Sequence, residues 1–224
     1  MPDYNRRSAI AAGLGILVGL PAAAAPLNPD EGVTAPEDLM KEHGVLNRCL
    51  LIYEEGIRRI ESKSDVAPEV FHATAALVKK FVEEYHEHNE ETYIFPEFVK
   101  AKKLVDLVDT LKTQHRAGRR VTLDILRLSG PGTFHAGADR TPLVAACRAF
   151  IRMYRPHEAR EDTILFPALR TILTAQQVTA LGDRMEQDEH KVLGDEGFER
   201  SVDQVAAIEK QLGIYDLKQF TPVG

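Results

Sequence analysis

The hydrophobic and polar positions follow a helical period from residue 34 onward. Apolar residues recur every three or four positions in long segments, as at Leu46, Leu50 and Ile57, and Pro and Gly stand between these segments. Runs of alternating β-branched residues are almost absent. A repeat of about 3.6 residues is typical of amphipathic α-helices that bury one face. The pattern therefore predicts an all-α protein, with helices over residues 34–62, 68–95, 104–128, 142–166, 175–193 and 202–212.

Local signals indicate where these helices begin and end. Thr34 and Glu37 have the spacing of a capping box at the start of the first helix, and a similar pair opens the fifth. Pro96 is expected to end or kink the second helix, because proline has no N–H to donate. Pro156 predicts a kink or bulge just before His157. Four long helices joined by short connections predict an up-and-down four-helix bundle with one or two extra C-terminal helices.

Residues 1–25 have the three-part layout of an export signal. A polar start with adjacent Arg6 and Arg7 is followed by an apolar run from Ala9 to Leu20 and then by small residues. The paired arginines resemble a twin-arginine signal, which predicts a periplasmic or secreted protein. An uncleaved anchor helix is the alternative, although the run is short for the roughly 20 residues that a span needs. Without this segment we expect no stable membrane association.

Composition limits the possible partners and compartments. The 224 residues include 28 Lys and Arg against 34 Asp and Glu, a net charge of −6, and no basic stretch carries interleaved aromatic residues. Nucleic acid is therefore an unexpected partner. Cys49 and Cys147 form no CxxC pair and cannot by themselves make a zinc finger. Two buried thiols are favoured over a disulfide, although an oxidising compartment would allow one.

An internal repeat carries the clearest chemical signal. Residues 86–96 align without gaps on residues 157–167, with six of eleven positions identical. Each copy begins with a His-x-x-x-Glu unit, His86 with Glu90 and His157 with Glu161, and ends in Phe-Pro. A further histidine precedes each unit at nearly the same distance, His43 before the first and His115 before the second. The repeat predicts two helix pairs of one design.

This design places metal-binding side chains in the bundle interior. Residues four apart lie on one side of a helix, and four antiparallel helices would bring all the repeated histidines and glutamates to one level. Burying so many polar groups without partners would cost several kcal/mol each, by an order-of-magnitude estimate. Cations would supply the partners, and the donor set is too large for one tetrahedral zinc but suits two ions bridged by the glutamates. Two Fe ions are favoured, with Mn or Zn possible.

The pattern H…HxxxE…H…HxxxE, with Phe-Pro after each HxxxE, resembles the hemerythrin-like, or HHE cation-binding, family. The resemblance covers residues 34–195 and leaves residues 196–224 as a C-terminal helix and tail. It implies a four-helix bundle with a non-haem di-iron centre, which members use for O2 carriage, sensing, iron homeostasis, nitric oxide chemistry or peroxide decomposition. The positions that match the family's ligands are His43, His86, Glu90, His115, His157 and Glu161.

One position departs from the family pattern. The residue four after His115 is Arg119, whereas oxygen-carrying hemerythrins have a second histidine there, so the resemblance does not extend to reversible O2 carriage. His190, four residues after Glu186, could replace the missing ligand and complete the second ion. The equally weighted alternative is that His190 and Glu186 form a pair on a solvated helix face.

Other polar residues are given structural roles. Tyr53 and Tyr154 could approach the metals, but core tyrosines with a bonded hydroxyl are the favoured interpretation. Glu91 and Asp162 could accept hydrogen bonds from ligand histidines, although a solvent-facing position is favoured. The remaining histidines are expected not to bind metal, and they are His72, His88 and His135.

Three functions are compatible with this sequence. A di-iron protein that reacts with O2, peroxide or nitric oxide is favoured. A protein that senses or buffers metal or gas without turnover is the second. A metal-free interaction or phosphotransfer module is the third and is disfavoured, because it predicts one exposed histidine rather than two matched His-x-x-x-Glu units. The oligomeric state is not indicated.

Overall fold

The computed structural model describes residues 34–135 and 137–222, which belong to one compact unit spanning residues 32–224. The predicted export signal lies outside the described residues. Within them every regular element is helical and no β-strand occurs, which confirms the all-α prediction. None of the described helices combines the length and the apolar character needed to cross a bilayer.

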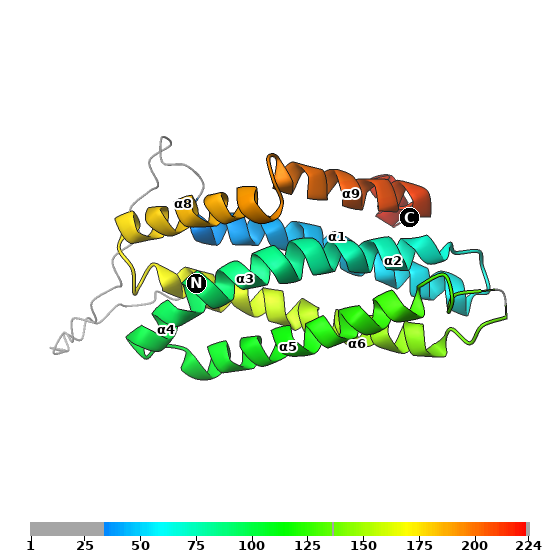
Figure 1. Ribbon diagram of the computed structural model, residues 1–224, viewed down its shortest axis with the longest axis horizontal. Coiled ribbons are helices and arrows are strands. Elements are labelled where there is room, and N and C mark those ends of the chain that lie inside the picture. Colours follow the sequence, from blue (N-terminus) through cyan, green and yellow to red (C-terminus); the bar gives the residue numbers. More distant parts are fainter. Residues whose placement is uncertain (1–33, 136, 223–224) are drawn as a thin grey trace, which may run out of the picture. The chain divides into compact units, whose positions relative to one another are not determined.

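Four helical rods form the bundle, and two of them are built from several segments (Figure 1). The first rod is α1 and the third is α5. The second and fourth rods contain π-helical segments, named η, between α-helical ones. The bounds are α1 Ala35–Glu61; α2 Pro68–Leu77, η1 Val78–His86, α3 Glu87–Asn89, η2 Glu90–Ile94 and α4 Phe95–Ala101; α5 Val105–Leu128; α6 Thr141–Arg160, η3 Glu161–Leu165 and α7 Phe166–Leu169.

Two further helices lie outside the four-rod bundle. They are α8, Ala175–Val192, and α9, Gly197–Leu212, and a short 3-10 turn, η4, covers Leu217–Phe220. Both helices pack along α1, and α9 also packs against α2 (Figure 1). Arg48 of α1 holds the Glu209 carboxylate of α9 through two hydrogen bonds of 3.0 and 2.6 Å. The prediction of a four-helix bundle with extra C-terminal helices is confirmed.

The predicted caps form as expected. The Glu37 carboxylate accepts a hydrogen bond from the backbone N–H of Thr34 at 3.1 Å, and Gln177 accepts one from the N–H of Thr174 at 2.9 Å. Each bond satisfies an N–H group at a helix start that has no partner within the helix. The last α-helix, α9, however, begins at Gly197 rather than at the predicted residue 202.

The prolines act differently from the prediction. Of the two outcomes expected at Pro96, an end or a kink, the first is wrong: the second rod continues to Ala101, and Pro96 lies in the first turn of α4, a position that tolerates proline. The bulge expected just before His157 instead follows it, since α6 runs through Pro156 and the π-helical segment starts at Glu161. Both glutamates of the repeat thus open a π-helical segment, a feature often found at functional sites.

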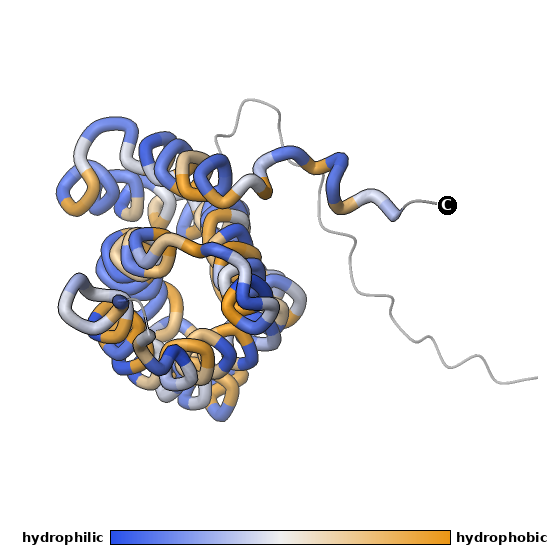
Figure 2. The backbone as a smooth tube through the Cα atoms, turned by 90° about the vertical axis from the view of Figure 1, so that its right-hand side faces the viewer, coloured by the Kyte–Doolittle hydropathy of each residue, from blue (hydrophilic) through white to orange (hydrophobic). Residues whose placement is uncertain are grey.

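Two apolar clusters fill the bundle on either side of a polar layer. The larger cluster includes Tyr53, Phe81 and Phe150, and the smaller one includes Phe95 and Phe166. Figure 2 looks along the bundle and shows the rods grouped around a common interior. The histidines and glutamates of the repeat occupy the level between the clusters. The histidine rings contact Phe95 and Phe166 of the smaller cluster on one side and Tyr154 of the larger cluster on the other.

Cys49 and Cys147 are free thiols in the larger cluster, both fully buried. Burial raises the pKa of each thiol to about 12, because a thiolate is poorly solvated there. The favoured expectation of two buried thiols is confirmed.

Candidate metal centre

The structure brings all six repeated residues together in the polar layer. Each of the four rods contributes at least one of them, and each is at most 3% exposed. The two glutamates come from the first positions of η2 and η3, where the π-helical geometry begins. The six residues are His43 of α1, His86 of η1, Glu90 of η2, His115 of α5, His157 of α6 and Glu161 of η3.

The four imidazoles form two pairs. The ring centroids of His43 and His86 lie 4.7 Å apart, and those of His115 and His157 lie 4.9 Å apart. In the second pair the two Nε2 atoms approach to 3.1 Å. Each pair, together with one glutamate, places its donor atoms within 4.8 Å of one another, which is close enough to share an ion.

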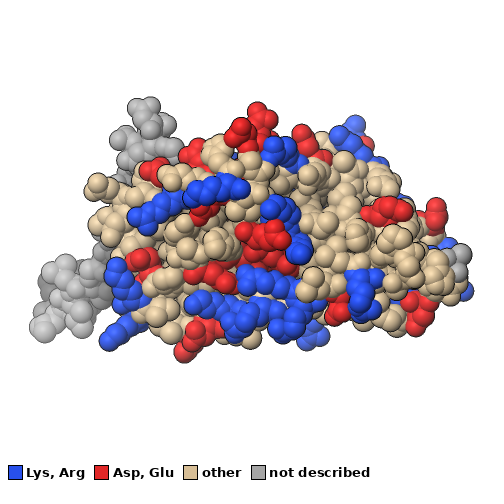
Figure 3. Space-filling view, viewed as in Figure 1, with Lys and Arg blue, Asp and Glu red and all other residues tan. Residues whose placement is uncertain are grey.

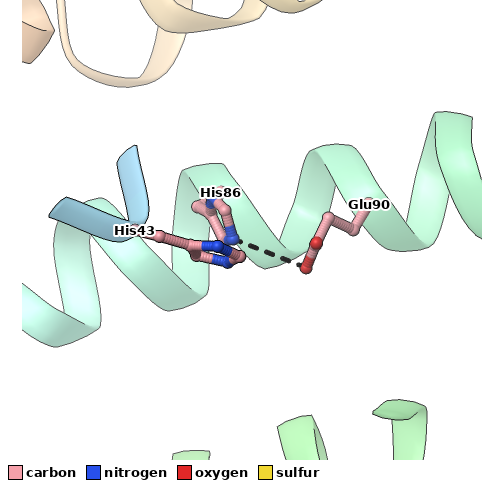
Figure 4. A group of neighbouring side chains, drawn as sticks. All are labelled: His43, His86 and Glu90. Atoms are coloured by element: carbon pink, nitrogen blue, oxygen red, sulfur yellow. Dashed lines mark ion pairs between the residues drawn. The ribbon is translucent and has the colours of Figure 1, made fainter. Parts of the chain in front are cut away.

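Each glutamate faces both imidazole pairs. Glu90 Oε2 lies 3.6 Å from Nε2 of His86 in the first pair and 3.5 Å from Nε2 of His115 in the second. Glu161 Oε2 lies 3.5 and 3.2 Å from Nε2 of the other two histidines, one in each pair. Figure 4 shows His43, His86 and Glu90 directed toward a common region, with the ion pair between His86 and Glu90 dashed. The carboxylates are therefore placed to bridge two positions.

The outer nitrogen of every imidazole has a partner. When Nδ1 donates a proton to an acceptor, Nε2 is left unprotonated and directed inward, which is the tautomer a metal requires. The four Nδ1 contacts are His43 to Asp162 at 2.8 Å, His86 to Glu42 at 2.7 Å, His115 to Glu91 at 2.9 Å and His157 to Gln114 at 2.9 Å. The structure thus corrects the favoured interpretation of Glu91 and Asp162 as solvent-facing side chains.

Sequence reasoning missed Glu42 and Gln114. Each directly precedes a repeated histidine along the chain, yet its side chain contacts the histidine of a neighbouring rod. Aligning the chain on His43 and His115 as well would have paired Glu42 with Gln114 and shown a polar residue at both positions.

The two carboxylates of the polar layer have no hydrogen-bond partner. Neither oxygen of Glu90 or of Glu161 has a hydrogen-bond partner, and both residues are fully buried. A buried ionised carboxylate without hydrogen bonds is strongly destabilised unless positive charge lies beside it. Donors of this kind fit cations of the first-row transition series, since neutral imidazole and carboxylate are their ordinary ligands.

The pKa values of Glu90 and His43 reflect an excess of carboxylate groups. Burial, reinforced by the negative charge of Glu161, raises the pKa of Glu90 well above its usual range. The pKa of Glu161 is lowered despite its burial, because His157 and His43 face it. Burial opposes protonation of His43 as well, but its contacts with Asp162 and Glu161 raise the pKa of its imidazole to about 10. The pKa values of Glu90 and His43 are therefore both shifted toward retention of a proton in this carboxylate-rich layer.

His190 does not join the other candidates. Its side chain is 56% exposed on α8, and its Nδ1 lies 3.2 Å from Asp195. Because α8 packs outside the four-rod bundle, it presents His190 to solvent rather than to the polar layer. The alternative prediction, that His190 pairs with an acidic residue on an exposed helix face, is therefore confirmed in part. The acidic partner is Asp195 rather than Glu186.

Tyr154 and Arg119 lie beside the centre, whereas Tyr53 lies in the larger apolar cluster. The Tyr154 hydroxyl donates to Glu87 at 2.5 Å, although its ring lies 5.4 Å from that of His157. Arg119 pairs with Glu87 at 2.8 Å and with Glu91 at 2.9 Å. Tyr53 packs edge-on against Phe150 as a core residue, but its hydroxyl has no hydrogen-bond partner, which corrects the expectation of a bonded hydroxyl at this position. On the face in Figure 3, basic side chains gather along α5 beside acidic ones near the middle of the bundle.

Comparisons with known proteins agree with this geometry. The family model described as hemerythrin HHE cation-binding domain matches residues 34–169 and again residues 106–212. The chain is 42% identical over 223 residues to the uncharacterized proteins Mb2018 of Mycobacterium bovis and Rv1995 of Mycobacterium tuberculosis, and the alignment covers 95% of this chain and 88% of each relative. No solved structure matches the chain.

Proposed function

The chain belongs to the hemerythrin HHE cation-binding domain family, and from this premise we propose that its polar layer holds two iron ions and reacts with O2, peroxide or nitric oxide. The donor set supports iron, because imidazole and carboxylate without thiolate suit a redox-active ion of five or six ligands. Mn and Zn are the alternatives that metal analysis would distinguish. Iron would supply the electrons for reduction of the small molecule.

The protein's own residues would bind and shield the ions. Glu90 and Glu161 each reach both imidazole pairs and so would fix the separation of the two ions. The Nδ1 partners hold the imidazoles in the binding tautomer. The Phe95 ring stacks on His115 at 5.5 Å and Phe166 stacks on His43 at 5.7 Å, so the apolar cluster excludes water from one side.

The observation that carries the proposal is the pair of buried carboxylates that have no hydrogen-bond partner and lie between four inward-facing Nε2 atoms. Metal analysis of the purified protein should give two ions per chain. His86→Ala and His157→Ala should each lower this number and weaken the visible absorption of the iron protein. His72→Ala, which removes an exposed histidine at the far end of the bundle, should leave both unchanged. An unchanged metal content in the first two variants would refute the assignment.

Sensing or buffering without turnover is the second candidate function. It is supported by the position of α8 and α9, which pack on α1 close to the centre and could report a change in it. The two candidates differ in stoichiometry. With a reductant and peroxide or nitric oxide, a catalyst consumes many molecules per iron, whereas a sensor or buffer stops at about one per ion.

We also propose that residues 1–25 direct export through the twin-arginine route to the periplasm or outside the cell, and that residues 34–195 form the cation-binding domain. Adjacent Arg6 and Arg7 ahead of the apolar run support the first point. Replacing both arginines by lysine should leave the protein in the cytoplasm with its first residues attached. Continued export of the doubly substituted protein would exclude this route.

A further inference from the structure

The two halves of the centre are related by the internal repeat, and the residues behind the ligands can be compared position by position. His43 corresponds to His115, and the residue before each supplies an Nδ1 acceptor to the neighbouring rod. The equivalent outer residues are Glu42 and Gln114, Asp162 and Glu91, Asn47 and Arg119, and Glu158 and Glu87. Every Nδ1 contact is repeated in both halves, but the charges differ between Glu42 and Gln114 and between Asn47 and Arg119.

The imidazole pair of His43 and His86 is backed by two carboxylates. Asp162 contacts Nδ1 of His43 at 2.8 Å, and Glu42 contacts Nδ1 of His86 at 2.7 Å. Glu42 is 2% exposed, and its second oxygen accepts a hydrogen bond of 2.9 Å from the Tyr85 hydroxyl, which fixes the carboxylate in place.

The imidazole pair of His115 and His157 has a different environment. His157 Nδ1 contacts the neutral amide oxygen of Gln114 at 2.9 Å. His115 Nδ1 contacts Glu91, but this carboxylate also accepts a hydrogen bond of 2.9 Å from Arg119. In the first half the position of Arg119 is occupied by Asn47, which contacts Glu158 at 3.0 Å without bringing a charge.

This difference has a direct effect on ligand strength. An ion at Nε2 requires the imidazole proton to be on Nδ1, so the outer residue must act as an acceptor. A carboxylate acceptor increases the electron density on the ring and makes Nε2 a stronger donor than an amide acceptor does. When an arginine also donates to that carboxylate, the carboxylate divides its negative charge between two donors. Its effect on the basicity of the imidazole is then smaller.

We propose that the two metal positions are inequivalent: the His43–His86 position binds its ion first and more tightly, and Glu42 and Gln114 are the positioning residues that set this order. The inference rests on the proposed two-ion centre. Changes in such outer residues typically alter metal affinity by about 10- to 100-fold, and the two stepwise dissociation constants should differ by a factor in this range. Both bridging carboxylates face the two positions alike and so do not favour either one.

The order of filling can be read directly with zinc, which is diamagnetic. The metal-free full chain, labelled with nitrogen-15 in its histidines, is titrated with Zn(II) and followed by NMR of the ring nitrogens. The first equivalent should shift the Nε2 signals of His43 and His86, and the second those of His115 and His157. Simultaneous shifts of all four signals throughout the titration would overturn the inference while leaving the two-ion centre intact. Two equivalents without any shift would overturn both.

A charge exchange between the halves gives the sharper test. The double variant Glu42→Gln with Gln114→Glu keeps the side-chain volumes and the total charge but should reverse the order, so that His115 and His157 shift first. Gln114→Glu alone should strengthen the weaker step and reduce the difference between the two constants. Glu84→Gln, which neutralises an exposed carboxylate, is the matched control and should keep the wild-type order. An unchanged order in the double variant would contradict the assignment of Glu42 and Gln114.

Discussion

The Nε2 atoms of His115 and His157 lie 3.1 Å apart in the interior of the bundle, although the residues are 42 positions apart in the sequence. Two unprotonated nitrogens at this distance repel each other unless a proton or a cation lies between their lone pairs. Their Nδ1 atoms are already engaged with Glu91 and Gln114, which favours the tautomers with free Nε2. The contact is therefore most stable with an ion close to both rings.

Metal removal should lower the stability of the folded protein. An ion that binds only the folded state stabilises it by about 4 kcal/mol when its free concentration is about 1,000 times Kd. For a chain of this size that corresponds to a decrease in Tm of about 10 °C on chelation. Thermal unfolding with and without a chelator measures the shift. His86→Ala should show a much smaller chelator effect, and an equal shift in that variant would point to metal bound elsewhere.

His190→Ala should have little effect. The His190 side chain is exposed and forms an ion pair with Asp195. Its loss therefore removes one surface ion pair. The free energy of unfolding should change by less than about 0.5 kcal/mol, and the metal content should stay at the wild-type value. Metal analysis and chemical denaturation test both statements. Loss of one ion per chain would restore His190 as a ligand.

Gly118→Ala should be destabilising because Gly118 leaves room for Tyr154. A Cβ atom at this position would overlap the Tyr154 hydroxyl, which donates to Glu87 and cannot move away without breaking that bond. Overpacking of this kind costs about 1–3 kcal/mol. Gly44→Ala is the control, since nothing lies within 4 Å of its added Cβ and alanine favours the helix by up to about 1 kcal/mol. Denaturant unfolding should show changes of opposite sign in the two variants.

Glu83 should make stability depend on pH. Burial raises the pKa of its carboxyl to about 7, so the folded state retains a proton that the unfolded chain releases near pH 4.5. The folded state therefore binds more protons between these values, and this contribution to stability is lost as the pH rises from about 4.5 to about 7. The loss is on the order of 2–3 kcal/mol.

Glu83→Gln should remove this loss. Relative to the wild type, the variant should gain stability between pH 5 and pH 8, as measured by denaturant unfolding across that range in the same metal state. Glu84→Gln on the exposed side of the same rod should keep the wild-type pH profile. A constant difference between the wild type and Glu83→Gln at all pH values would show that the Glu83 carboxyl titrates normally.

Several features of the centre follow from periodicity alone. The spacing of His86 to Glu90, and of His157 to Glu161, places each pair on one side of a helix, and the duplicated design makes the two pairs face each other in an antiparallel bundle. Local spacing is enough for this result because it depends on helix geometry, which the apolar repeat already indicates. The capping residue Thr34 similarly predicted the first helix start from local hydrogen bonding.

The sequence by itself determined the helical character of the rods and the caps, since each depends on contacts within a few positions along the chain, and the internal repeat identified the six residues that meet in the polar layer. Only the tertiary structure decided which residues support them. Glu42 and Gln114 act on histidines of neighbouring rods, and Glu91 and Asp162 cross between the two helix pairs. His190 could be placed outside the layer only once the packing of α8 against α1 was known. The physical reason is that rotation and axial shift of one rod against another are set by side-chain packing summed over the whole bundle, which no local spacing specifies.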